Sequence, residues 1–217
     1  MSIKENLLAI NETIPDTVTL VAVSKTKPMS YIQEAYDEGQ RIFGENRVQE
    51  MTEKWENLPK DIEWHMIGHL QRNKVKYMAE YVSLVHGVDS PRLLTEINKQ
   101  AEKHNRIISC LLQVHIAEED TKFGFNEEEL LELVDNEQFK AYKNIKIVGL
   151  MGMATFTDNL EQVRKEFSGL KSLFTKLKSN YIDFTTLSMG MSGDYKIAIE
   201  EGSTMVRIGS SIFGSRN

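Results

Sequence analysis

The chain has 217 residues, which is enough for one sizeable core but short for two, so we expect a single domain over residues 1–217. Its formal net charge of −6, with both signs interspersed, excludes the broad basic surface that nucleic acid or an anionic membrane attracts. No apolar run approaches the roughly 18 residues of a membrane span, and the N-terminus lacks a signal-peptide pattern, so we expect a cytoplasmic protein.

Short apolar runs alternate with helix-forming segments along the whole chain. A helix expected over Ile3–Glu12 precedes the first run, and we expect it to close the bottom of the fold. The predicted strands are Val18–Ser24, Arg41–Gly44, Glu63–Ile67, Leu84–Val88, Ile107–His115, Ile145–Leu150, Thr185–Met189 and Met205–Ile208. The predicted helices are Pro28–Glu38, Arg47–Glu56, Asn73–Tyr81, Pro91–His104, Glu127–Val134 and Leu160–Leu177.

The strands read mostly as continuous apolar runs, which is typical of a parallel sheet buried on both faces. Their alternation with helices allows either an open doubly wound sheet or a closed barrel. Eight short repeating units favour closure. The sequence therefore predicts an α/β fold, a single (β/α)₈ TIM barrel with an extra N-terminal helix. The stretch Asp120–Lys143 leaves its helix limits open.

In such a barrel, chemistry sits in the loops that follow the C-terminal ends of the strands. Chemically useful residues collect there: Lys25, Asn46, His69, Met189, Ser192, Arg207, Gly209 and Ser210.

Lys25 follows a buried run and would carry its ammonium to the barrel mouth. Partial desolvation there lowers the pKa of a lysine, and a neutral amine can attack an aldehyde to form a Schiff base. Alternatively, Lys25 pairs with a phosphate or marks an exposed strand end. Lys27 competes for the role, although Pro28 indicates that the loop has begun and that Lys27 points outward or adds positive potential.

The exits of the seventh and eighth strands are rich in glycine and serine, which let backbone N–H groups and hydroxyls converge on a phosphate. These two loops are also the recurrent phosphate site of the fold. The alternative is that the glycines only form turns. If a short helix follows Ile208, its N-terminus adds a favourable dipole.

Metal binding is not expected, because His69, His86 and His115 lack a His-x-x-x-His pair or a cysteine cluster. Nucleotide-binding and serine-hydrolase glycine motifs are missing as well. Met189 and Met191 are either core residues or part of the pocket lining.

Five ordered motifs resemble the YggS/PROSC family, the pyridoxal phosphate homeostasis proteins, over nearly the whole chain. They are Val21–Pro28 (VAVSKTKP), Phe43–Asn46 (FGEN), Trp64–Lys74 (WHMIGHLQRNK), Leu187–Ser192 (LSMGMS) and Val206–Gly214 (VRIGSSIFG). The resemblance implies a fold like the N-terminal barrel of alanine racemase, with pyridoxal 5′-phosphate (PLP) on Lys25.

The resemblance also implies that the phosphate lies among Ser192, Gly209 and Ser210, and that Arg207 faces the pyridine nitrogen or the phosphate. Asn46 and His69 would be mouth residues near the ring, with contacts not assigned. An arginine at the ring nitrogen weakens the cofactor as an electron sink.

The sequence departs from the family at His115, within Gln113–Gly124, where members commonly carry asparagine. It also ends at Asn217, soon after the last motif, so contacts of a longer tail are not expected.

The related racemases resemble this chain over the barrel alone, and their second domain supplies an opposing tyrosine across a dimer. Racemisation needs acid–base groups on both faces of the substrate. We therefore expect a monomeric PLP carrier in intracellular PLP homeostasis, without catalytic residues, that serves PLP-dependent apo-enzymes. The alternatives are a weak racemase-like enzyme, a sugar-phosphate barrel enzyme and an interaction scaffold without a cofactor.

Overall fold

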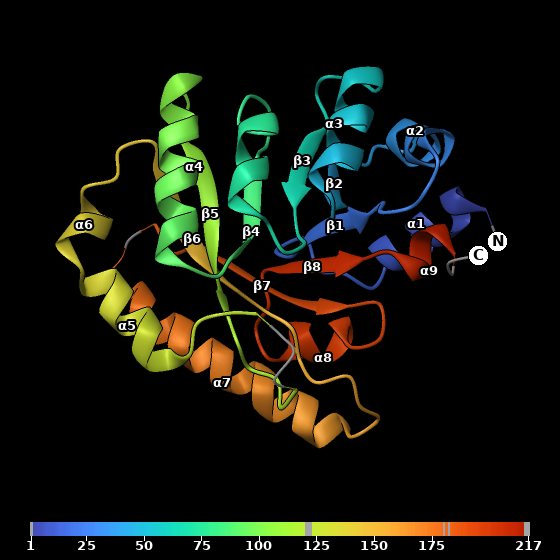
Figure 1. Cartoon of the computed structure of the whole chain (residues 1–217). Coiled ribbons are helices and arrows are strands. Elements are labelled where there is room, and N and C mark those ends of the chain that lie inside the picture. Colours follow the sequence, from blue (N-terminus) through green and yellow to red (C-terminus); the bar gives the residue numbers. More distant parts are fainter. Residues whose placement is uncertain (1, 120–122, 180, 182, 215–217) are drawn as a thin grey trace.

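The computed structural model of the chain describes residues 2–119, 123–179, 181 and 183–214. Eight parallel strands form a closed barrel in the order β1-β2-β3-β4-β5-β6-β7-β8. They are β1 (Thr19–Val23), β2 (Ile42–Glu45), β3 (Glu63–Met66), β4 (Leu84–Val88), β5 (Ile108–Val114), β6 (Ile145–Gly152), β7 (Thr186–Met191) and β8 (Met205–Ile208). The predicted (β/α)₈ barrel is confirmed (Figure 1).

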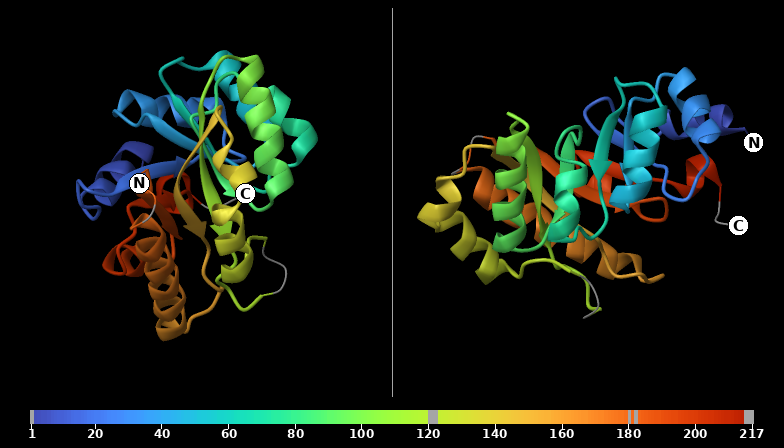
Figure 2. Two further views of the ribbon diagram at one scale, coloured as in Figure 1. Left: turned by 90° about the vertical axis from the view of Figure 1, so that its left-hand side faces the viewer. Right: turned by 45° about the horizontal axis from the view of Figure 1, so that its top comes forward.

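Helices cover the outside of the barrel, as both views in Figure 2 show. They are α1 (Ile3–Asn11), α2 (Met29–Asp37), α3 (Val48–Asn57), the 3₁₀ helix η1 (Arg72–Tyr77), α4 (Pro91–Lys103), α5 (Glu127–Asp135), α6 (Glu137–Lys140), α7 (Leu160–Lys178), α8 (Tyr195–Glu200) and α9 (Ser210–Phe213). None of the helices among the described residues combines the length and apolarity needed to span a bilayer.

Closure joins β8 to β1, with Leu20 opposite Val206 and Ala22 opposite Ile208. This register brings the exit of β8 beside the exit of β1. The glycine-rich loops at the end of the chain therefore lie next to the lysines near its beginning.

The barrel interior changes character along its axis. Its N-terminal half is an apolar layer of Val21, Leu84, Leu111, Met151 and Met205. Next to this layer, two residues beyond Leu84 and Met205 on the same strands, lie His86 and Arg207. Together with His65 and Ser188 they form a buried polar group. Since side chains of a strand alternate between faces, this polar group forms the floor beneath the C-terminal mouth.

Two expectations about helices are wrong. The helix expected over Asn73–Tyr81 is the shorter 3₁₀ helix η1, although the apolar residues that predicted it, Val75, Met78 and Ala79, are fully buried. The N-terminal helix exists, but it packs against α2 and α9 instead of closing the bottom. The Asn6 side chain donates a hydrogen bond to the Ile212 carbonyl of α9 at 3.0 Å.

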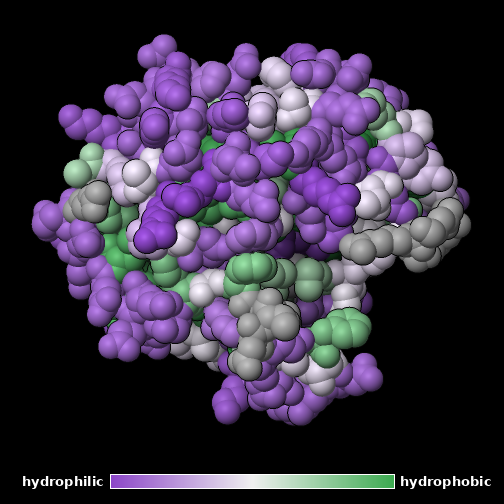
Figure 3. Space-filling model, viewed as in Figure 1, coloured by the Kyte–Doolittle hydropathy of each residue, from purple (hydrophilic) through white to green (hydrophobic). Residues whose placement is uncertain are grey.

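The face of the molecule seen in Figure 3 is mostly hydrophilic, with apolar side chains at scattered places. Several exposed apolar residues belong to the loops around the barrel mouth. Phe156 is 98% exposed and Met191 is 37% exposed. This distribution matches a chain whose charges of both signs are dispersed.

Candidate functional site

The first strand ends in a tight turn that carries Lys25. Val21 and Val23 face the barrel interior and the mouth, and alternation puts Lys25 on the same face, where it is half-buried. The turn is closed by the Lys27 N–H, which donates to the Ser24 carbonyl at 3.0 Å. Strand geometry therefore delivers the Lys25 amine into the mouth of the barrel.

A cavity of about 490 Å³ lies at the mouth, within the 300–1,000 Å³ typical of small-molecule sites. It collects residues from the exits of β1, β2, β3, β6, β7 and β8. They are Val23, Lys25, Lys27, Asn46, Ile67, Met153, Phe156, Met191, Ser192, Gly193, Asp194, Arg207, Gly209, Ser210 and Gly214. Six of the eight predicted site residues thus come together: Lys25, Asn46, Ser192, Arg207, Gly209 and Ser210.

The loops after β7 and β8 contact each other at this cavity. The Gly209 N–H donates to the Ser192 Oγ at 3.3 Å, and Ser210 begins α9. A Cβ atom added to Gly209 would lie 3.0 Å from the Val23 carbonyl oxygen, so glycine lets β8 approach β1 closely. Hydroxyls and a backbone without side chains therefore line one side of the cavity.

Arg207 supplies a fixed cation to the cavity. Its guanidinium donates to the Ser188 carbonyl at 2.9 Å, to the Ser188 Oγ at 2.6 Å and to the Gly152 carbonyl at 3.1 Å. Burial lowers the pKa of Arg207 to about 10, against the opposing effect of the Asp194 carboxylate. The group still carries its positive charge near neutral pH.

Two buried histidines extend this hydrogen-bond chain beneath the cavity. His86 Nδ1 lies 3.0 Å from the Ser188 Oγ, and His86 Nε2 lies 3.1 Å from His65 Nδ1. Since arginine can only donate, the Ser188 hydroxyl accepts from Arg207 and keeps a second lone pair and its own proton for the contact with His86 Nδ1. Both ring nitrogens of His86 are thus engaged, one by Ser188 and the other by His65.

Burial keeps both histidines neutral. It lowers the pKa of His65 to about 3, and burial, with smaller effects of His65 and Arg207, holds the pKa of His86 well below 6.5. Sequence reasoning missed this pair as part of the site. The available signal was a histidine at an inward-facing position in each of two neighbouring apolar strands.

His69 does not line the cavity. Its Nδ1 lies 2.9 Å from Asp89 Oδ2, and its ring stacks on Phe123 with centroids 4.0 Å apart. His115 lies outside the cavity as well, with Nε2 3.0 Å from the Glu119 carbonyl oxygen. Part of the loop between His115 and Gly124, residues 120–122, lies outside the described residues.

Met189 also lies away from the cavity, while Met191 lines it. Ser188 faces the barrel interior, so alternation turns the fully buried Met189 outward into the core beneath the helices. A register shift between Ser188 and Met191 and a φ of 96° at Gly190 then break the alternation. The irregular strand end redirects Met191 toward the mouth.

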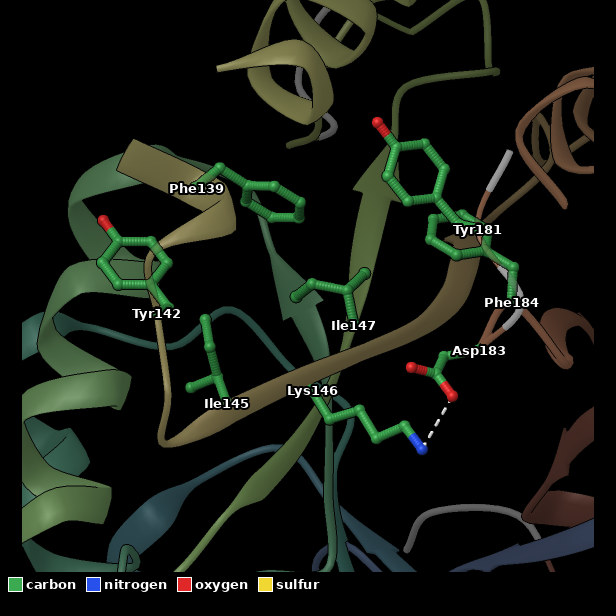
Figure 4. Close-up of a pocket in the computed structure, with 8 residues that line it drawn as sticks. All are labelled: Phe139, Tyr142, Ile145, Lys146, Ile147, Tyr181, Asp183 and Phe184. Atoms are coloured by element: carbon green, nitrogen blue, oxygen red, sulfur yellow. Dashed lines mark ion pairs between the residues drawn. The ribbon is translucent and has the colours of Figure 1, made fainter. Parts of the chain in front are cut away.

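A second cavity, of about 340 Å³, lies near the N-terminal ends of β6 and β7, opposite the mouth. Aromatic side chains flank it, with Phe139 and Tyr142 on one side of Ile147 and Tyr181 and Phe184 on the other (Figure 4). Its charged groups, Lys146 and Asp183, form an ion pair at 2.9 Å. The polar side chains suited to binding or chemistry therefore gather at the other end of the barrel, in the mouth cavity. Among the described residues, no cluster of His, Cys, Asp and Glu could hold a metal ion.

The fold and the mouth cavity define a class of protein: a (β/α)₈ barrel whose mouth brings a lysine together with an arginine and with loops rich in glycine and serine. The chain belongs to the family described as "Alanine racemase, N-terminal domain", whose model matches residues 1–217.

Curated relatives carry the name "Pyridoxal phosphate homeostasis protein". The protein of that name from Aquifex aeolicus is 44% identical over 199 residues, covering 91% of this chain and 86% of that protein. Its counterpart from Escherichia coli K12 is 39% identical over 210 residues, covering 94% of this chain and 88% of that protein. The resemblance drawn from the five sequence motifs is confirmed.

Solved structures agree. PipY of Synechococcus elongatus, solved with PLP bound, has a TM-score of 0.89 and 34% sequence identity, covering 98% of this chain and all of that one. Alanine racemase of Clostridium difficile has a TM-score of 0.80 at 16% identity and covers 99% of this chain but 57% of that one. At this identity the racemase supports the fold alone.

Proposed function

We propose that the chain binds pyridoxal 5′-phosphate through Lys25 and acts in PLP homeostasis as a cofactor carrier. The observation that carries the proposal is the mouth cavity, which brings Lys25 together with Arg207 and the β7 and β8 loops. The names of the curated relatives and the PLP-bound PipY structure support the same cofactor.

The residues present fit this cofactor chemically. PLP supplies an aldehyde that condenses with an amine, and a phosphate that needs donors. Lys25 provides the amine, and we assign Ser192, Gly209 and Ser210 to the phosphate. A side chain at Gly209 would press on the Val23 carbonyl and crowd this loop. The Asp194 carboxylate also lines the cavity, but its Oδ1 accepts the Met191 N–H at 2.6 Å and so closes the β7 turn.

A carrier function suits the openness of the site. The cavity includes the strongly exposed Phe156 and the partly exposed Met191, so water reaches its rim. Enzymes that handle carbanions exclude water from the site. Arg207 remains a cation and gives up its proton reluctantly near neutral pH, which disfavours proton transfer at that position. An accessible mouth instead allows the cofactor to be loaded and released.

The proposal extends to partners and assembly. PLP-dependent apo-enzymes are the chemically sensible recipients, since they carry lysines that accept the same aldehyde. We also propose that the protein is a monomer with the described barrel as its working unit. Light scattering of the purified protein tests the monomer.

The decisive experiment is reaction of the purified protein with PLP, followed by borohydride reduction and peptide mass mapping. We expect a visible absorbance band and a reduced adduct on Lys25, and loss of both in Lys25→Ala. Lys27→Ala is the matched control, because Lys27 lines the same cavity. We expect this variant to carry the adduct on Lys25 as wild type does.

Other outcomes would point to the alternatives. A wild-type protein without any band would contradict the cofactor assignment and favour a sugar-phosphate enzyme or a scaffold. Robust turnover of amino acids by the loaded protein would contradict the carrier function while leaving the Lys25 assignment in place.

A further inference from the structure

A buried ion cluster lies beneath the turn that carries Lys25. Lys54 of α3 is 3% exposed, and its Nζ lies 2.7 Å from Glu45 Oε1, 2.7 Å from Glu50 Oε1 and 2.9 Å from the Ser24 carbonyl oxygen. An ammonium has three N–H donors, so these contacts use all of them. None of these four residues lines the mouth cavity. The cluster therefore acts on the cavity indirectly, through the turn above it and through Asn46, the neighbour of Glu45.

The cluster holds the backbone on both sides of Lys25. On one side, Ser24 gives its carbonyl to Lys54 and donates its hydroxyl to Glu45 Oε1 at 2.6 Å. On the other side, the Thr26 N–H donates to Glu50 Oε1 at 2.6 Å. Lys25 is thus bracketed by two fixed residues. Its backbone cannot rotate without breaking a charge-assisted hydrogen bond.

Thr26 is held in an unfavourable backbone conformation. Its φ is 62°, in the left-handed region that a β-branched residue rarely adopts. Such a conformation persists where the surrounding structure enforces it. The hydrogen bond from Thr26 to Glu50, and the ion pair from Glu50 to Lys54, supply that enforcement.

The conformation of Thr26 matters because two lysines line the cavity. Lys25 and Lys27 flank Thr26, so its φ sets the direction of one amine relative to the other. An amine must approach an aldehyde carbon to within about 3–3.5 Å in the correct direction before it reacts. A fixed turn can therefore favour one amine over an otherwise equivalent neighbour.

We propose that Lys54, acting through Glu50 and Glu45, is a positioning residue that determines which of the two lysines takes the aldehyde. The inference rests on the proposed function. The reaction being directed is a condensation: the amine nitrogen bonds to the aldehyde carbon, two amine protons go to the carbonyl oxygen, and that oxygen leaves as water. No electrons are gained or lost.

The charge of Lys54 explains why the cluster is sensitive. Burial raises the pKa of the Glu45 carboxyl, while the nearby Lys54 ammonium and the Ser24 hydroxyl act to lower it. Without Lys54, two carboxylates would lie close together with no cation between them. They would separate or take up protons, and Glu50 would release Thr26.

The test is the ratio of reduced PLP adduct on Lys25 to that on Lys27, measured by peptide mapping in a set of variants. Wild type is expected to carry the adduct on Lys25. In Glu50→Ala the ratio should fall at least fivefold, because Thr26 loses its acceptor. Glu50→Gln should restore most of it, since its amide oxygen can accept the same N–H. Lys54→Met should resemble Glu50→Ala.

Two controls protect the conclusion. Glu53→Ala removes an exposed carboxylate from the same helix and should leave the ratio unchanged. Because Lys54→Met leaves buried carboxylates uncompensated and can fail to fold, Glu50→Ala, which removes a less buried carboxylate, carries the test in its place. Thr26→Gly is the second control: glycine adopts a φ of 62° without strain and keeps the N–H that Glu50 accepts, so this variant should leave the ratio unchanged. Circular dichroism checks that each variant is folded.

The outcomes separate the two proposals. If wild type carries its adduct on Lys25 but folded Glu50→Ala keeps the wild-type ratio, the positioning function is wrong and the proposed function stands. If wild type forms no adduct on Lys25, the proposed function itself fails, and the positioning inference fails with it. A merely structural contribution would lower stability without moving the ratio between two lysines of one turn.

Discussion

The side chains under the cavity form a hydrogen-bonded chain from Arg207 through Ser188 and His86 to His65. Its first bond runs from Arg207 to Ser188, because a guanidinium cannot accept, and burial keeps both histidines neutral. The chain therefore fixes the orientation of Arg207 through neutral groups and adds no second charge to the floor. A cavity that binds an anion benefits from a cation that neither moves nor is neutralised by a buried carboxylate.

The histidines give this floor a pH dependence. Their pKa values in the folded protein lie below the unfolded value of about 6.5, at about 3 for His65 and well below 6.5 for His86. As the pH falls below about 6.5, the unfolded chain takes up protons that the folded protein does not. The stability from these groups is thus complete above that pH and is lost as the pH falls.

We predict that His86→Gln will flatten the pH dependence of unfolding. Each histidine that stays neutral in the fold costs about 1.4 kcal/mol of stability per pH unit below its unfolded pKa. Urea unfolding at pH 7.5, 6.0 and 5.0 should show a smaller loss in the variant than in wild type. His104→Gln, which changes an exposed histidine, serves as the control. Equal slopes for wild type and His86→Gln would refute the buried neutral histidine.

At the scale of elements, the sequence carried enough information to predict the barrel. Each strand is a short β-branched or apolar run, and such runs remain readable because burial on both faces of the sheet demands them. The ends of the strands also located Lys25, Arg207 and Gly209 at one mouth, since parallel strands deliver their exits to the same end. These predictions needed only local pattern and topology.

The remaining features depended on contacts between distant parts of the chain. The position of Met191 follows from the irregular end of β7, and the pairing of His69 with Asp89 joins two different loops. The short helices α6 and α8 contain too few residues to display a period. Lys54 reads in the sequence as an ordinary helical surface charge, and only the fold buries it against Glu45.

Helix starts offer a prediction at this scale, because the N-cap residues of α5 and α4 differ in their hydrogen bonding. Asn126 accepts the Glu129 N–H at 2.9 Å and completes a capping box, whereas Ser90 makes no side-chain cap hydrogen bond before Pro91. Asn126→Ala should therefore cost about 1 kcal/mol in the free energy of unfolding. Ser90→Ala should cost clearly less. Denaturant unfolding of both variants checks the difference, and equal losses would contradict it.

At the scale of the whole molecule, the mouth cavity links the first and last strands. Lys25 follows β1, while Ser192, Arg207 and Gly209 come from β7 and β8, near the end of the chain. A ligand that contacts both groups bridges the place where the barrel closes. Binding should consequently stabilise the closed barrel as a whole, beyond any effect on a single loop.

We predict that the protein unfolds in one cooperative thermal transition and that PLP raises its midpoint. A ligand at 100 times its Kd stabilises the folded state by about 2.7 kcal/mol, which for a domain of this size corresponds to roughly 5–10 °C. Differential scanning calorimetry with and without PLP measures the shift. Inorganic phosphate, which on the proposed assignment contacts the β7 and β8 loops but not Lys25, should produce a smaller shift.

Two lysine variants test whether PLP raises the thermal midpoint by bridging the joint between β1 and β8. Lys25→Ala should reduce the PLP shift to about that of inorganic phosphate, because the ligand would then contact only one side of the closure. Lys27→Ala should retain most of it. A different result would be two thermal transitions, of which PLP shifts only one. The barrel would then not unfold as one domain, and the prediction that PLP stabilises it through the joint between β1 and β8 would be wrong.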